Sequence, residues 1–204
     1  MISVSEMRAL EDSSGIPKDV LMDHAGRAAA QALREKFDIK NKNILIVCYH
    51  GNNGGDGFVM ARKLCDEAEV DVLFAGDEAR LKGPALRNYR RLQDHIMIQM
   101  VDMDDVDFSD YNFIVDCIFG TGIHAEIREP ILSLINSLNK AEAVKISIDV
   151  PSGVDPDTGQ KANVYFEPDF LITFHDMKQG LEEYSDRAVV VDIGLGNVLN
   201  NPEI

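Results

Sequence analysis

The 204-residue chain carries a formal net charge of −15 and is 45% hydrophobic, which indicates a single globular domain over residues 1–204 with a substantial core. This acidic balance excludes a nucleic-acid-binding surface, which needs a basic stripe, and disfavours a membrane surface as partner. No apolar run is long enough to span a bilayer, and we recognise no signal peptide. The three cysteines show neither disulfide-framework nor zinc spacing, so we expect core packing and a reducing, cytoplasmic location.

The chain begins with two predicted helices. The first covers residues 5–11. The second begins near Pro17, a residue that suits the first turn of a helix, and carries an apolar stripe as far as Leu33. We expect these helices to cover the sheet that follows, and a dimer contact through Met22 and its neighbours is the alternative.

Beyond them, short apolar runs alternate with helical patterns. The runs are mostly continuous and rich in Val, Ile and Phe, as expected for strands buried on both faces. They predict strands at residues 44–48, 70–75, 96–98, 113–115, 145–148, 171–174 and 188–193. Helical patterns lie between them at residues 55–67, 84–92 and 130–138. This alternation predicts an α/β fold with a mostly parallel central sheet, helices on both faces and ligands beyond the carboxyl ends of the strands.

A glycine-rich run, Gly-Asn-Asn-Gly-Gly-Asp-Gly at residues 51–57, follows the first predicted strand and leads into a helix. Glycines let the backbone approach an anion closely, and a helix N-terminus offers unpaired N–H groups with a partial positive charge. The order strand, glycine-rich turn and helix therefore predicts a phosphate cradle. Its two amides and one carboxylate suggest that the run also orients another part of the ligand.

Charged side chains come shortly after three later strands. These are Asp116, Asp149 and Lys178, and we expect them to share one crevice with the glycine-rich run. The carboxylates beside an anionic ligand require a positive partner, for which Lys178 and a bound cation are the candidates. The oxygens of Asn53, Asp116 and Ser152, with backbone carbonyls, offer an all-oxygen cage. Because this cage contains a single carboxylate, it favours a monovalent cation such as potassium over a divalent one.

Taken together, these motifs resemble the NAD(P)H-hydrate epimerase family, the YjeF N-terminal domain, over nearly the whole chain. The resemblance rests on residues 6–11, 21–26, 52–57, 116–122 and 149–153, and on Thr173-Phe174 with Lys178 and Gly180-Leu181. It implies a Rossmann-like three-layer sandwich. It also implies an isomerase that interconverts the R and S epimers of hydrated NADH or NADPH, which are damaged cofactors with a hydroxyl on the nicotinamide ring.

The same resemblance implies which residues form the site. It gives substrate contacts at Asn52, Asn53, Gly54, Gly55, Asp56, Gly120, Thr121, Gly122, Ile123, His124, Ala125, Glu126 and Asp149. Its potassium ligands, for one ion per subunit, correspond to Asn53, Asp116 and Ser152. The family suggests a homodimer. Bifunctional relatives continue into a dehydratase domain where this chain ends, which implies a separate dehydratase acting on the product.

Three places in the chain depart from the family pattern. Tyr49-His50 replaces the usual Gly-x before Gly51, which alters the entry to the cradle, and Asp23 stands where relatives most often carry Glu. The segment after Gly122 lacks a glycine that many relatives have, so the substrate contacts there are carried over least directly.

For the reaction we predict Asp149 and Lys178 as a general acid–base pair that assists loss and return of the hydroxyl, or opening and closing of the ring. A turn-capping Asp149 and a surface Lys178 are the plain structural alternatives. For the whole chain, the second hypothesis is a non-catalytic nucleotide-binding or scaffold module of the same fold. The third is an NAD-dependent dehydrogenase, although the glycine spacing is not GxGxxG and Asp77 is a weak candidate for a ribose-binding acid.

Overall fold

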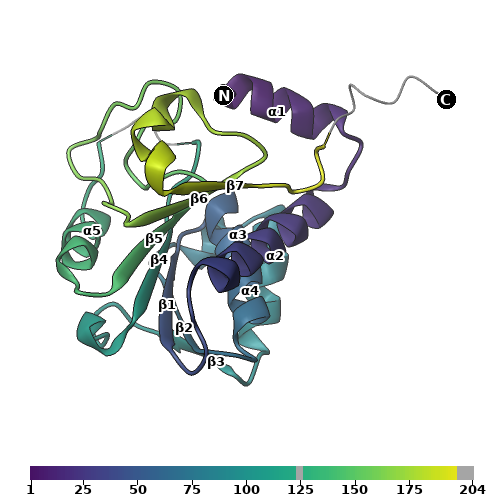
Figure 1. Ribbon diagram of the computed structural model, residues 1–204. Coiled ribbons are helices and arrows are strands. Elements are labelled where there is room, and N and C mark those ends of the chain that lie inside the picture. The colour runs from purple at the N-terminus through teal and green to yellow at the C-terminus, as the bar shows by residue number, and fades with distance from the viewer. Residues whose placement is uncertain (123–125, 197–204) are drawn as a thin grey trace.

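Seven parallel strands form the central sheet of the computed structural model, which describes residues 1–122 and 126–196 (Figure 1). Their order is β3-β2-β1-β4-β5-β6-β7, so the order along the chain reverses between β1 and β4, where parallel α/β sheets open a crevice for ligands. In sequence order the strands are Asn43–Cys48, Glu69–Phe74, Ile98–Val101, Phe113–Cys117, Val144–Ile148, Phe170–Phe174 and Ala188–Val191.

Helices cover both faces of this sheet (Figure 1). The helices α2, α3 and α4 pack on one face, and α5 with the 3-10 segment η3 packs on the other. The predicted three-layer α/β sandwich is therefore confirmed, and the sheet is parallel throughout. The helical elements are α1 (Val4–Ser13), α2 (Lys18–Lys36), α3 (Asn52–Leu64), η1 (Glu78–Arg80), α4 (Gly83–Gln93), η2 (Phe108–Asp110), α5 (Ile131–Lys140) and η3 (Gln179–Arg187).

The central strand β1 shows why continuous apolar runs mark this sheet. Ile44 and Ile46 face the helices α2 and α3, whereas Leu45 and Val47 face α5, and all four side chains are fully buried. Each contributes about 1.5–3 kcal/mol of burial free energy. For the same reason the predicted boundaries of β1, β4, β5 and β6 lie within two residues of the observed ones.

The edge strand β3 differs from the prediction. It covers Ile98–Val101, whereas the apolar run at residues 96–98 was expected to form it. After α4 the chain turns tightly, with the His95 N–H donating to the Leu92 carbonyl and the Ile98 N–H donating to the His95 carbonyl. These turns leave the Ile96 side chain 99% exposed, so the apolar run is divided between a turn and a strand.

The N-terminal segment lies across the carboxyl ends of the strands and carries α1 with it (Figure 1). Ile2 forms a parallel β-bridge with Lys178, and the amino group of Met1 lies 3.0 Å from the Asp176 carboxylate. The Val4 N–H donates to Asp157 at 2.7 Å. These contacts hold α1 above the sheet, next to the segment that carries Lys178.

Burial decides two further predictions. Met22 is 5% exposed, and its thioether lies where a side chain on Gly55 would be, so this side chain packs α2 onto α3 within the chain. The three cysteines are free and buried, as expected for core packing. None of the described helices is long and apolar enough to cross a membrane.

Candidate active site

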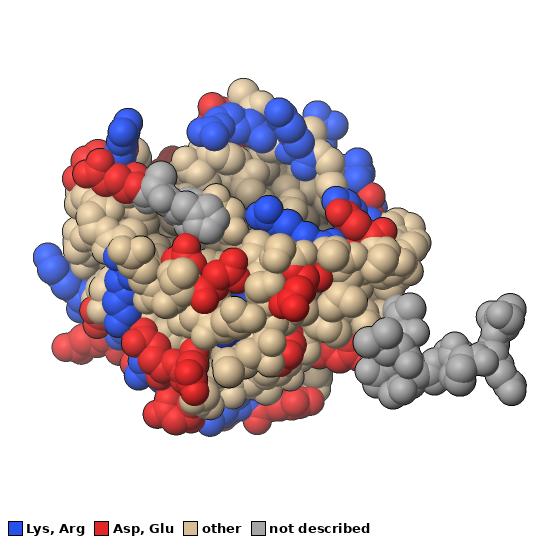
Figure 2. All heavy atoms as spheres, turned by 90° about the horizontal axis from the view of Figure 1, so that it is seen from above, with Lys and Arg blue, Asp and Glu red and all other residues tan. Residues whose placement is uncertain are grey.

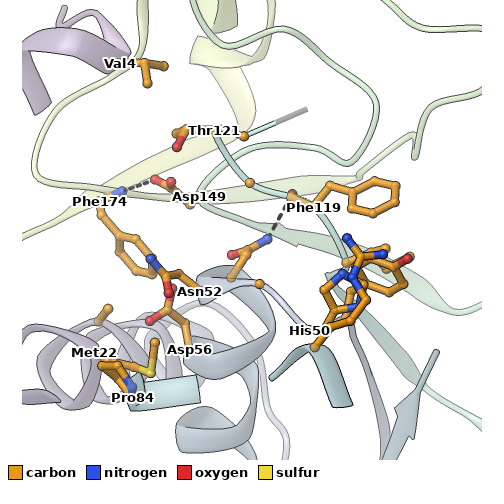
Figure 3. A pocket seen from close by; sticks show the side chains of 18 of the residues that line it. Val4, Met22, His50, Asn52, Asp56, Pro84, Phe119, Thr121, Asp149 and Phe174 are labelled. Atoms are coloured by element: carbon orange, nitrogen blue, oxygen red, sulfur yellow. Dashed lines mark hydrogen bonds between the residues drawn. The ribbon is translucent and has the colours of Figure 1, made fainter. Parts of the chain in front are cut away.

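A cavity of about 740 Å³ opens beyond the carboxyl ends of β1, β2, β4, β5 and β6, between the N-terminus of α3 and the overlying α1 (Figure 3). It gathers residues that are far apart in the sequence. The sequence-predicted site residues that line it are Asn52, Asn53, Asp56, Gly120, Thr121, Gly122, Glu126 and Asp149. The predicted residues Gly54, Gly55, Asp116, Ser152 and Lys178 do not line it, and Ile123, His124 and Ala125 lie outside the described residues.

The glycine-rich run forms the first turns of α3 and is not a loop. Gly51 is the N-cap, and a side chain added at this position would enter open space. By contrast, a side chain on Gly54 would overlap the backbone carbonyl of Tyr49, and one on Gly55 would lie 2.5 Å from the Met22 methyl carbon. These inner glycines therefore let α3 pack closely on Tyr49 and Met22. The sequence predicts instead that they make room for an anion. The N–H groups of the first turn have no partner within the helix and point toward the cavity end of α3.

A hydrogen-bond network lies at the floor of the cavity, where β4 meets the turn after β5. Asp116 is fully buried and belongs to β4 itself, opposite Val47 of β1. Its carboxylate accepts hydrogen bonds from the Ser152 hydroxyl at 2.5 Å, the Ser152 N–H at 2.8 Å, the Ser147 hydroxyl at 3.0 Å and the Ile118 N–H at 3.1 Å. Burial raises the pKa of Asp116 to about 6, and these four bonds oppose the rise.

Asn53 joins the same floor from α3 and is left incompletely bonded. Its amide Nδ2 donates to the Phe119 carbonyl at 3.0 Å, and the Phe119 N–H donates to the Ser152 hydroxyl at 2.8 Å. The Asn53 Oδ1 atom is buried and accepts no hydrogen bond from the described residues. A buried acceptor without a donor costs about 1–3 kcal/mol, so a positive group beside it is expected. Among the described residues, no group of three His, Cys, Asp or Glu side chains is arranged to hold a metal ion.

Asp149 occupies a strained turn directly beyond β5. Its φ angle is 65°, and the Val150 N–H donates across it to the Ile148 carbonyl, a backbone conformation that few non-glycine residues adopt. The Asp149 carboxylate pairs with the Lys178 ammonium and accepts the Phe174 N–H at 3.3 Å (Figure 3). The turn directs this carboxylate into the cavity.

Lys178 lies behind Asp149 and is fully buried. Besides Asp149, its ammonium donates to the Thr173 hydroxyl at 3.0 Å and to the Phe174 carbonyl at 2.9 Å. All three hydrogen atoms of the ammonium therefore have acceptors in the protein. The lysine that was expected to lie on the crevice instead anchors the aspartate that does.

Two further carboxyl groups face the same cavity. Asp56 extends from the second turn of α3, and Glu11 extends from α1. Burial, followed by the charges of Asp149 and Glu11, raises the pKa of Asp56 well above its ordinary value. Burial and then the charge of Asp149 also raise the pKa of Glu11. Each of these acids therefore holds its proton more strongly than an exposed carboxyl does.

Basic side chains also line the cavity, beside the acids Glu126 and Glu129. Arg8, Lys18, Arg80 and Arg128 line it, and Figure 2 shows Lys and Arg side chains gathered around a hollow on this face. Sequence reasoning missed these residues and Glu11. Part of the signal was present, because the α1 residues that face the cavity, Val4, Met7, Arg8 and Glu11, recur at helical spacing.

The segment Tyr49-His50, which departs from the family pattern, forms part of the cavity wall. Tyr49 and His50 both line the cavity, and their ring centroids lie 3.8 Å apart with the rings tilted by 37°. Tyr49 also meets Phe119 edge-on, with the centroids 5.1 Å apart. Burial, together with the charge of Arg80, lowers the pKa of His50. Asp77, the weak candidate for a ribose-binding acid, instead caps η1 by accepting the Ala79 N–H at 2.9 Å.

Comparison with known proteins shows the family to which the chain belongs. The family model described as YjeF-related protein N-terminus matches residues 18–180. The chain belongs to the YjeF N-terminal family. The Nitrosopumilus maritimus protein named NAD(P)H-hydrate epimerase is 40% identical over 91% of this chain and 89% of its own length. Its namesake from Cenarchaeum symbiosum is 38% identical over the same shares.

Other similar proteins are longer or more distant. The bifunctional NAD(P)H-hydrate repair enzyme of Methanothermobacter thermautotrophicus is 38% identical over 89% of this chain, which spans 37% of that protein. The crystal structure of the yeast protein ynu0 superposes with a TM-score of 0.80 at 23% identity, covering 94% of this chain and 88% of the yeast chain. This structural likeness supports the Rossmann-like fold.

Proposed function

We infer that this protein is an NAD(P)H-hydrate epimerase, an isomerase that interconverts the R and S forms of hydrated NADH and NADPH. Relatives of that name match it over about nine-tenths of both chains. The single observation that carries the inference is the meeting of the α3 N-terminus, the 120–122 turn and Asp149 at one cavity. Binding without turnover is the prediction of the scaffold hypothesis.

The cavity suits a hydrated dinucleotide in size and charge. Its volume of about 740 Å³ lies within the usual range for small-molecule sites. The free N–H groups at the start of α3 and the basic side chains in the lining, Arg8, Lys18, Arg80 and Arg128, offer two positions for phosphate groups. The Asp149 carboxylate lies deeper, where the hydroxylated ring would sit. Asn52, Asn53, Asp56, Gly120, Thr121, Gly122 and Glu126 are then the proposed substrate contacts, with Gly54 contributing through its backbone.

Asp149 is the proposed acid–base residue, and Lys178 supports it. The buried ammonium keeps one carboxylate oxygen in place, so the remaining carboxylate oxygen is directed at the substrate. Epimerisation inverts a carbon that bears both oxygen and nitrogen, and a carboxylate at that carbon assists the proton movements. Because all three N–H groups of the Lys178 ammonium donate hydrogen bonds to protein acceptors, we assign Lys178 a positioning role.

We propose that a potassium ion binds at the floor of the cavity. The orphaned Asn53 Oδ1 supports this, and the Ser152 hydroxyl and the Asp116 carboxylate supply further oxygens nearby. When bound, the ion supplies positive charge beside a buried carboxylate. One carboxylate among neutral oxygens suits a monovalent ion better than a divalent one.

We further propose that the protein forms a homodimer and that a separate dehydratase consumes its product. The existence of bifunctional NAD(P)H-hydrate repair enzymes among its relatives supports the second of these partners. Analytical ultracentrifugation tests the first. A coupled assay, in which a dehydratase specific for one epimer consumes an epimer mixture completely only when this protein is present, tests the second.

The direct test supplies the pure R epimer and follows the S epimer by chromatography. We expect the wild-type protein to exceed spontaneous epimerisation, and Asp149→Asn to lower kcat by at least a hundredfold, in the range of general acid–base catalysis. Asp23→Asn, on the outer side of α2 and paired with Arg27, is the matched control and keeps its activity. Wild-type protein that binds nucleotide but does not beat the spontaneous rate would support the scaffold hypothesis.

A further inference from the structure

Two aspartates face the cavity from opposite walls, and the acid–base pair predicted from sequence includes only one of them. Asp149 lies beyond β5 on one wall, and Asp56 rises from α3 on the other (Figure 3). Inversion at a single carbon has a geometric requirement, because the oxygen leaves from one face of the ring and returns to the other. A proton-transfer group on each side meets that requirement.

We propose, on the basis of the function inferred above, that Asp56 is a second catalytic residue that works across the substrate ring from Asp149. Asp56 gives its proton to the hydroxyl on its side, and Asp149 takes a proton from the water that adds on the opposite side. The other epimer reacts with the two roles exchanged. Lys178 touches neither face of the ring and only positions Asp149.

The step balances without any co-reactant other than water. The proton of Asp56 moves to the hydroxyl oxygen, and the carbon–oxygen bond breaks with its electron pair leaving on water. The lone pair of the neighbouring ring nitrogen fills the vacancy, which makes the carbon planar. A water molecule then forms the new carbon–oxygen bond from the other face and loses one proton to Asp149. Nothing is oxidised or reduced, and the enzyme ends with one proton moved from one carboxyl to the other.

The surroundings of the two aspartates suit these roles. The Asp149 carboxylate has a buried ammonium against it. Within the described part of the chain, no hydrogen bond or ion pair reaches the partly buried Asp56 carboxyl. The titratable and charged groups near Asp56 are Glu11 from α1, the Cys117 thiol at the end of β4, and Asp149 with Lys178 behind it. Two of its neighbours are thus acids, which favours the protonated form of Asp56.

The test compares Asp56→Asn with Asp12→Asn in both directions, starting from each pure epimer. Asp12 is exposed on α1, pairs with Lys18 at 3.3 Å and does not line the cavity, so its variant controls for one lost charge near the site. We expect Asp56→Asn to lower kcat at least a hundredfold in both directions with KM changed less than threefold, and Asp56→Glu to restore part of the rate. In the direction in which Asp56 is the acid, wild-type kcat falls as pH rises through the pKa of Asp56, and the residual activity of Asp56→Asn lacks that limb.

A second readout follows the oxygen. In water enriched with oxygen-18, each turnover replaces the hydroxyl oxygen, so mass spectrometry finds the label in the product epimer. A product that keeps its original oxygen overturns the proposal, as does an Asp56→Asn enzyme whose kcat is within threefold of the wild-type value.

If Asp56→Asn does not fold, Asp56→Glu decides: its high-pH limb shifts if the proposal holds and stays in place if it does not. A wild-type protein with no epimerase activity instead refutes the underlying function.

Discussion

The two walls of the cavity present an aspartate each but are built by opposite means. On the α3 wall, glycines remove side chains so that the helix packs directly on β1 and α2, and Asp56 has acids as neighbours. On the wall beyond β5 and β6, a strained turn presents Asp149 and a buried lysine anchors it. The first wall should be intolerant of added volume and the second of changed charge. The same side-chain chemistry can thus serve as acid in one place and base in the other.

The largest expected effect tests the intolerance to volume. Gly54→Ala places a methyl group against the Tyr49 carbonyl, and neither backbone can yield without moving α3 away from β1. We expect a loss of more than about 3 kcal/mol in the free energy of unfolding, at the upper end for overpacking. Gly51→Ala, which enters open space at the N-cap, should cost about 1 kcal/mol or less. Urea unfolding measures both, and equal losses would contradict the comparison.

Charge is tested next, on the opposite wall. Lys178→Met keeps much of the side-chain volume but leaves Asp149 without its cation and the Phe174 carbonyl without its donor. We expect a loss of about 2–4 kcal/mol, somewhat below the cost of breaking a fully buried pair because the Asp149 side chain is 16% exposed. Adding Asp149→Asn should recover part of this loss. A double variant that is no more stable than Lys178→Met would show that packing dominates on this wall.

Sequence reasoning succeeded where one local signal determined the outcome. Continuous apolar runs located the buried strands, and the acids and the lysine just after them located the wall beyond β5 and β6. It failed at β3, where the apolar run at residues 96–98 competes with the turn that ends α4. It also missed η3, a mostly polar segment whose Leu181 and Tyr184 are buried only because the tertiary fold places them on the sheet.

The α3 wall was predictable in position but not in construction. A run with glycine at four of seven positions opposes helix formation by intrinsic propensity, so residues 51–57 read as a turn. Contacts with Tyr49, Met22 and Cys48, which no sequence pattern announces, override that propensity. Likewise, the position of Lys178 near the crevice followed from the strand order. Its complete burial depends on how the Thr173-Phe174 backbone folds around it.

Replacing Asp56 is expected to change the free energy of unfolding less than the substitutions above, and in the stabilising direction. Because the folded protein raises the pKa of this residue above its ordinary value of 3.8, the ionised form destabilises the fold. Asp56→Asn should therefore stabilise the protein at pH 8 by more than about 1 kcal/mol, one pKa unit being 1.36 kcal/mol. The gain should be absent well below the ordinary pKa of 3.8, where both states hold the proton, grow as the pH rises above that value, and level off above the folded pKa. Thermal melts from pH 4 to pH 8 measure it, and a gain that is constant with pH would show that charge is not its cause.

An effect of similarly modest size concerns the proposed potassium ion, which would join the two walls. Asn53 belongs to the α3 wall and Ser152 to the turn after β5, and the Phe119 backbone already connects them. An ion that binds only the folded protein stabilises it by RT ln(1 + [L]/Kd), so at ten times Kd we expect about 1.4 kcal/mol, or roughly 3–6 °C in melting temperature. Melts in potassium, sodium and choline chloride at equal ionic strength measure this, with Asn53→Ala expected to abolish the difference. Because the ion would contact both walls, hydrogen exchange at α3 and at residues 149–153 should slow together. Slowing on one wall alone would mean that the two are held independently.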